Sequence, residues 1–290
     1  MFNLIKMELY RLFKSTSTWV LMVLTVLLTL LVIGVTSSDL NYMKEQGEKF
    51  GNADSIGVET NDDGTTQVNT GFYFDTSYEW INNDVNIAEF VNVELRSCIL
   101  LILFAIFAAV YVNAENKSGF VKNLAGRMRY KGNLFIAKLP SLLIFTLIEF
   151  LIMYIVTAVG VRLFIGEIDL SISADMAKTL AVQMLLSFAF ICMVAFLTVL
   201  SKGTVLPSVI GIVFAAGMAN LLWAGVNIAA KKLGAADDFT VAKYTLVSNI
   251  QLAGSNSEMY SVTRAVLVAV IFIAVSCAAS FAVMNKRDIR

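Results

Sequence analysis

Long apolar runs with few charged residues constrain this chain more than any other feature. A transmembrane helix needs about 20 predominantly apolar residues. The runs are continuously apolar and do not alternate with period two, which excludes the strands of a membrane barrel, whereas helices satisfy their own backbone hydrogen bonds in lipid. We therefore predict a single all-α integral membrane domain over residues 1–290. Its six predicted transmembrane helices are residues 18–35, 95–112, 134–164, 180–200, 205–226 and 265–284.

Composition supports this fold class and excludes several functions. Of the 290 residues, 58% are hydrophobic and only 15% are charged, whereas a typical soluble domain has about 25% charged residues. The chain has no histidine, the side chain that most often binds metals and titrates near neutral pH. Cys98, Cys192 and Cys277 each lie inside an apolar stretch, so we interpret them as buried hydrophobic residues. Zero net charge argues against nucleic-acid binding, and we expect no metal site.

Basic residues near the ends of the spans predict the orientation. Residues 114–138 carry six basic side chains and one acid, Glu115. Further basic residues lie before the first span, after the last span, and at position 202 between the fourth and fifth spans. Six spans place all of these on one side, which is the cytoplasm because cytoplasmic loops are rich in Lys and Arg. Both termini are therefore predicted to be cytoplasmic. The side chain of Lys138, near the start of the third span, is expected to extend into the headgroup region.

The first external segment, residues 37–92, is long and acidic, with eleven acids and two lysines. Residues 61–66 (Asn-Asp-Asp-Gly-Thr-Thr) lie between strand-forming residues, a pattern that predicts a hairpin. Residues 77–92 mix apolar and acidic side chains, as in a helix at the membrane surface. Two interpretations stay open: a small cap that gates an exit, since long ordered loops are often functional, and a solvated loop.

The segment before the first span, residues 1–16, has the pattern of an amphipathic helix. Its apolar side chains fall within one arc at 100° per residue, and Lys6, Glu8, Arg11 and Lys14 lie outside that arc. Such a helix lies in the interface, where its basic residues suit anionic lipid. It either anchors the first span only or also contacts a cytoplasmic partner. The apolar arc comprises Phe2, Ile5, Leu9, Leu12 and Phe13.

One carboxylate, Glu149, falls near the middle of the third span. Charged residues at such a depth usually face the interior of a helix bundle or a polar path. Gln183 and Asn220 in neighbouring spans are candidate partners, although no spacing pairs them with Glu149. These three residues are our candidates for a translocation path. A hydrogen bond between helices and a proton relay are the alternative roles of Glu149.

The chain has no recognisable catalytic motif. It lacks the Gly-x-x-x-x-Gly-Lys-Ser/Thr loop that binds nucleotide phosphates, and the Gly-x-Ser-x-Gly elbow of serine hydrolases. We therefore predict that this chain is not an enzyme and that it holds no cofactor of its own.

A family resemblance rests on two segments, one directly before the first span and one directly after the second span. The amphipathic segment 1–14 ends in a basic residue before the first span. After the second span come Glu115, Gly119, the short stretch 120–124, and Arg127 with Arg129. This arrangement resembles that of ABC-2-type transporter permeases, the transmembrane subunits of bacterial ATP-driven exporters. Topology and the long first external loop are similar to the Gram-positive members linked to peptide export and bacteriocin self-protection. The chain departs from many relatives by having Ala-Gly-Arg-Met-Arg where they have a proline-containing turn.

The resemblance implies a mechanism. Two permeases, identical or related, assemble in the bacterial cytoplasmic membrane with two separate ATPase subunits, which hold the ATP and magnesium. The cytoplasmic segment 114–133 acts as a coupling helix in a cleft of the ATPase. The cargo implied is a peptide, a lipid-like molecule or a drug. The predicted coupling residues are Glu115, Lys117, Gly119, Phe120, Lys122, Leu124, Arg127 and Arg129.

Three alternatives remain open at this stage. The positive charge of residues 114–133 could serve only to fix the topology. The chain could be a secondary transporter or channel driven by ion gradients, a class that usually shows paired intramembrane charges or interrupted helices. It could also be a membrane sensor or scaffold whose acidic external loop binds a ligand.

Overall fold

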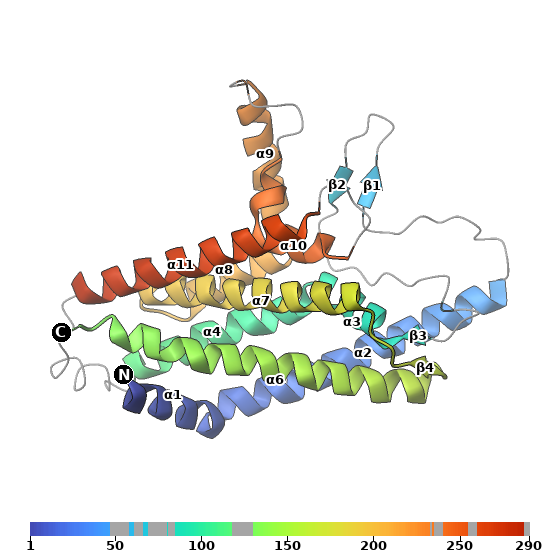
Figure 1. The fold of residues 1–290 in the computed structure, drawn as a ribbon, viewed down its shortest axis with the longest axis horizontal. Coiled ribbons are helices and arrows are strands. Elements are labelled where there is room, and N and C mark those ends of the chain that lie inside the picture. Colours follow the sequence, from blue (N-terminus) through green and yellow to red (C-terminus); the bar gives the residue numbers. More distant parts are fainter. Residues whose placement is uncertain are drawn as a thin grey trace.

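The computed structural model is a bundle of long helices (Figure 1). It describes residues 1–46, 58–60, 66–68, 80, 85–117, 130–232, 234, 240–254 and 260–286. Four helices are long and apolar enough to cross a membrane, and a fifth crossing is formed if one bent helix pair is counted as a single span. The described part of the chain is thus mostly helical, as the apolar runs predict.

The chain begins with two consecutive helices, α1 (Phe2–Lys14) and α2 (Thr16–Gln46). Helix α1 coincides with the amphipathic segment predicted for residues 1–16. Helix α2 contains the predicted span 18–35 and continues for about three more turns, into the segment predicted to be external. Val23, Leu27 and Leu31 on α2 are exposed apolar side chains, which is the surface a helix presents to lipid.

The second predicted span is bent. Helices α3 (Ile87–Arg96) and α4 (Ile99–Lys117) meet at 61°. Cys98 has a φ of 60°, a left-handed conformation that interrupts the helix. Asn86 caps α3 by accepting hydrogen bonds from the amides of Ala88 and Glu89. The predicted boundary at residue 95 is therefore wrong, because helical structure begins eight residues earlier and breaks just after the predicted start.

Three further helices match their predicted spans closely. Helix α6 (Asn133–Phe164) corresponds to residues 134–164, α7 (Ala174–Ser201) to 180–200, and α11 (Val262–Lys286) to 265–284. Helix α7 packs against α4 and α11, while α2 packs against α6. Large aromatic side chains fill the interior between α4 and α6, where the rings of Phe107 and Phe145 stack with centroids 3.5 Å apart.

The fifth predicted span, residues 205–226, is not one continuous helix. Helix α8 (Val205–Ala215) has 11 residues, which gives about 17 Å at 1.5 Å per residue, against a hydrocarbon core of about 30 Å. Gly217 then turns the chain with a φ of 70°, and α9 (Ala219–Lys232) projects away from the bundle (Figure 1). The short helices η3 (Val241–Tyr244) and α10 (Leu246–Leu252) lead into α11.

The strands are short. In the external segment, β1 (Val58–Thr60) and β2 (Thr66–Val68) pair antiparallel, on either side of the turn where the sequence predicts a hairpin. β3 (Val85–Asn86) pairs in parallel with β4 (Ile168–Asp169), which ties the start of α3 to the connection between α6 and α7. Most of residues 47–84 lie outside the described residues, so the predicted cap stays a prediction.

Several helix ends meet at one end of the bundle (Figure 1). Helix α1 begins there, α4 ends there, α6 begins there, and α11 ends there. This end therefore brings together the two helices that flank residues 118–129. The sequence assigns it to the cytoplasmic side.

Candidate functional site

The predicted coupling segment is described only at its edges. Glu115 and Lys117 form the last turn of α4. Gly119, Phe120, Lys122, Leu124, Arg127 and Arg129 lie outside the described residues. The structure does show what holds the two flanking helix ends, and that anchor is a buried network centred on α1.

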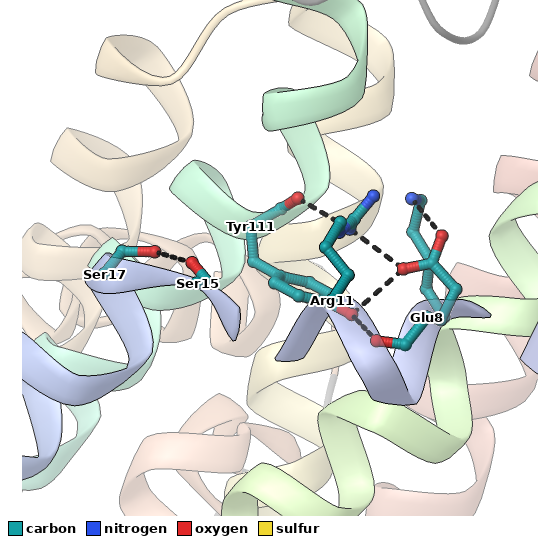
Figure 2. A network of polar contacts seen from close by, with 6 residues as sticks. Glu8, Arg11, Ser15, Ser17 and Tyr111 are labelled. Carbon is teal, nitrogen blue, oxygen red and sulfur yellow. Dashed lines mark hydrogen bonds and ion pairs between the residues drawn. The ribbon is translucent and has the colours of Figure 1, made fainter. Parts of the chain in front are cut away.

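Glu8 is the centre of this network (Figure 2). Its side chain is 1% exposed. The hydroxyl of Tyr111 on α4 donates to a carboxylate oxygen of Glu8 and lies equally close to its backbone carbonyl, both at 2.9 Å. The ammonium of Lys138 on α6 donates to the other carboxylate oxygen, also at 2.9 Å. One carboxylate on α1 thereby joins α4 and α6.

Arg11, one turn after Glu8, strengthens the same junction. Its guanidinium forms an ion pair with Glu8 at 2.9 Å and donates to the backbone carbonyl of Tyr111 at 3.1 Å. It also lies over the Tyr111 ring, 4.2 Å from the centroid. The Tyr111 ring stacks on Phe107, which in turn stacks on Phe145. The network is thus continuous with the aromatic packing between α4 and α6.

The burial of these charges corrects two predictions. Glu8 and Arg11 were expected to face the headgroups, and Lys138 was expected to extend toward them, yet Lys138 is 3% exposed. Burying a charge is costly unless it is paired and hydrogen-bonded, and here two cations share one carboxylate. The exposed side chains of α1 include Phe2, Phe13 and Lys14. Two of the five side chains in its apolar arc therefore face outward, and the face containing Glu8 and Leu12 faces the protein.

The start of α6 is also held by the end of α11. The backbone amide of Gly132, which precedes α6, donates to the side-chain carbonyl of Asn285 at 2.9 Å. A Cβ at Gly132 would lie 2.3 Å from the ring of Phe281, so only glycine permits this close approach. The beginning of α6 is thereby fixed between α1 and the carboxyl-terminal helix.

The three residues predicted to line a path are not brought together by hydrogen bonds. Glu149 is buried on α6, where its carboxylate lies close to the hydroxyl of Thr25 on α2. The amide of Gln183 on α7 donates instead to Asn92 on α3 at 2.9 Å. Asn220 lies in the first turn of α9. Neither candidate partner, Gln183 or Asn220, forms a hydrogen bond with Glu149 in the part of the chain that the structure describes.

Sequence reasoning missed a second buried acid, Glu94 on α3. It accepts a hydrogen bond from Thr29 on α2 at 2.7 Å and another from Thr157 on α6 at 3.2 Å. Glu94 directly precedes the predicted span, residues 95–112, and so lies at the edge of an apolar run. The amphipathic pattern of residues 87–95 could have indicated that Glu94 is buried, because Glu94 lies one turn from Phe90 and Val91 on the apolar face of that helix.

The helices define a class of protein, a multi-pass helical membrane protein whose amino-terminal helix is bound to two of its spans. The family model for ABC-2 family transporter proteins matches residues 4–218, which include helices α1 to α8. The chain therefore belongs to the ABC-2 transporter family, whose proteins are membrane components of transporters that work with ABC ATPases. A comparison with curated proteins gives no match.

Proposed function

We propose that this chain is the permease subunit of an ATP-driven exporter in a bacterial cytoplasmic membrane, and that a separate ATPase acts on residues 114–133. The observation that carries the proposal is the buried network of Glu8, Arg11, Tyr111 and Lys138. It joins the helix before the first span to both helices that flank the proposed coupling segment. A force applied between these helices therefore reaches α1, α4 and α6 together.

The packing supports transmission of such a movement into the membrane. Tyr111 lies less than two turns before the end of α4, and Lys138 lies about one turn after the start of α6. Phe107 and Phe145 stack one turn deeper on α4 and about two turns deeper on α6. Closely packed side chains transmit displacement because interiors are incompressible. The ends of α4 and α6 are thus expected to move as one unit with α1.

The proposed assembly contains two permeases and two ATPase subunits, with both termini of this chain in the cytoplasm. Lys6 and Lys14 of α1 are exposed, where they suit anionic lipid headgroups. The cargo is proposed to be a peptide, a lipid-like molecule or a drug, which leaves along a path between the two permeases. Resemblance to the exporters linked to bacteriocin self-protection supports the peptide class.

The test is ATP hydrolysis by the reconstituted complex. Candidate ATPases are co-expressed with the full chain, co-purified and placed in nanodiscs. We expect co-purification and an ATPase rate that falls in Glu115→Ala and in a deletion of residues 120–124. Glu89→Ala is the matched control, because Glu89 is an exposed acid on α3, toward the opposite end of the bundle. Unchanged hydrolysis in both coupling variants would refute the proposed role of residues 114–133.

A further inference from the structure

Helix α9 leaves the bundle instead of completing the fifth predicted span (Figure 1). It begins directly after residue 218, the last residue that the family model matches. Apart from two asparagines, its residues are apolar or small up to the last turn, which ends in Lys231 and Lys232. Leu222 and Ile228, on different sides of the helix, are both exposed. Helices that are apolar on all sides are normally buried, so α9 requires a covering beyond the described part of its own chain.

The depth of α9 in the membrane follows from the helix before it. Asn113, near the end of α4, lines one cavity together with residues 201–206, so α8 begins beside the end of α4 that precedes the proposed coupling segment. Helix α8 is about 17 Å long, roughly half of a hydrocarbon core of about 30 Å. Figure 1 shows α9 running across the direction of the long helices. Helix α9 therefore lies near the middle of the membrane along its whole length.

Neither lipid nor water suits α9 at this depth. Lys231 and Lys232 are exposed, and neither forms an ion pair among the described residues. Charged side chains near the middle of a bilayer are costly and usually face a bundle interior or a water-filled cavity. The two membrane surfaces are about 15 Å away, farther than a lysine side chain extends. Water, in turn, would leave Leu222 and Ile228 uncovered. A surface with both apolar and polar parts is what a second membrane protein offers.

The direction of α9 is fixed by contacts within the chain. The rings of Phe214 on α8 and Trp223 on α9 pack edge to face, with centroids 6.3 Å apart. The side-chain carbonyl of Asn227 accepts a hydrogen bond from the backbone amide of Val241, at the start of η3, at 2.8 Å. Gly217 supplies the positive φ of the turn between α8 and α9. Helix α9 is thus already held in its projecting position, which lowers the entropy lost when it docks.

We propose that α9 packs against a second copy of this chain, across the exposed face of that copy's α11. Helix η3 contacts both α9 and α11, so α9 and this face are neighbours on one side of the bundle. The face consists of Leu267, Ile271 and Val275, which are four residues apart and all exposed. A two-fold axis makes the contact reciprocal, so one interface covers both copies of α9. Lys231 and Lys232 then lie beside the proposed path between the permeases. The inference rests on the pairing of two permeases in the proposed function and assigns the contact between them.

The first test is photo-crosslinking of the full chain in membranes, expressed without any ATPase. A photoreactive phenylalanine derivative replaces Leu222 or, as the matched control, Leu151, an exposed leucine of α6 on the other side of the bundle from α9 (Figure 1). We expect position 222 to give covalent dimers in which it is joined to α11, and position 151 to give lipid adducts. Adducts of position 222 mainly with lipid, with its own chain or with a different protein would each overturn the proposal.

The second test measures dimerisation of the purified chain in detergent as a function of its concentration. Leu222→Gln and Ile271→Gln should each weaken the dimer about tenfold or more, whereas Leu151→Gln should leave it unchanged. All three side chains are exposed in a single copy, so the unfolding midpoint of the diluted monomer should not differ among the variants. Equal dimerisation of Leu222→Gln and Leu151→Gln would overturn the contact through α9. A wild-type chain that stays monomeric at every concentration would overturn the pairing of identical copies, and the ATP hydrolysis test of residues 114–133 is independent of both results.

Discussion

The substitution Glu8→Gln tests whether the buried network stabilises the junction of α1, α4 and α6. It removes the negative charge that faces Lys138 and Arg11, while keeping the size of the side chain. Removing one partner of a buried ion pair typically costs about 3–5 kcal/mol, because the other charge stays buried without compensation. Lys138, at 3% exposure, would lose its ion pair with this carboxylate. For a chain of this size, the corresponding drop in the unfolding midpoint is about 6–20 °C.

The chain contains a matched control for this prediction. Asp175 and Lys178 form an ion pair at the same distance, 2.9 Å, but their side chains are 93% and 69% exposed. Exposed pairs contribute little, since water and salt screen them. Asp175→Asn should therefore leave the midpoint nearly unchanged. The two substitutions remove the same kind of charge from a pair of the same length, so their difference compares a carboxylate in a buried network with one in an exposed pair.

The assay is thermal unfolding in detergent, followed by the loss of the monodisperse peak in size-exclusion chromatography. A double variant, Glu8→Gln with Lys138→Met, distinguishes an uncompensated charge from lost packing. We expect it to unfold at a higher temperature than Glu8→Gln alone, because the buried cation that faced the Glu8 carboxylate is removed as well. Equal midpoints for Glu8→Gln and Asp175→Asn would refute the reasoning, as would a double variant that is less stable than both single variants.

Further predictions concern glycines at close helix contacts. Gly132→Ala places a Cβ 2.3 Å from the ring of Phe281 and should destabilise the protein by about 1–3 kcal/mol; Phe281→Leu in the same chain should recover part of the loss. Gly211→Ala on α8 places a Cβ 2.6 Å from that of Ala105 on α4 and should cost a similar amount, partly restored by Ala105→Gly. Gly225→Ala on α9 meets no atom within 4 Å and should instead stabilise by up to about 1 kcal/mol. The unfolding midpoints of the three single variants and the two double variants measure these effects. A loss of stability in Gly225→Ala would contradict the helix-propensity argument.

The apolar runs predicted the long helices well because hydrophobic length is a local property of the sequence. Helix α6 begins and ends within one residue of the predicted span. The broken helices were less predictable. The interruption at Cys98 is a single left-handed residue inside an otherwise apolar run, and Cys is not a residue that signals a turn. Gly217, just after the end of α8, has a positive φ and turns the chain inside the fifth predicted span. Whether a glycine in an apolar run packs or turns depends on its tertiary surroundings.

The buried acids show a second reason why the sequence alone predicts only part of the structure. Glu149 was identified because an acid in the middle of an apolar run has no local explanation. Glu8 and Glu94 lie at the edges of such runs, where an acidic side chain is normally expected to be exposed to water. Their burial depends on partners far along the chain: Tyr111 and Lys138 for Glu8, and Thr29 and Thr157 for Glu94. No local pattern contains these contacts.

Helix α6 connects the three buried acids physically. Lys138 binds Glu8, Glu149 lies 11 residues later, and Thr157, which binds Glu94, lies another eight residues on. At 1.5 Å per residue these positions are about 17 Å and 12 Å apart along one continuous helix. Residues 138 and 149 also lie within about 20° of each other around the axis, since 11 residues make almost three full turns. A helix is stiff along its axis, so a displacement imposed at its first turns is expected to reach both intramembrane acids. α6 is therefore the element through which the junction near the coupling segment and the two buried acids deeper in the bundle would influence each other.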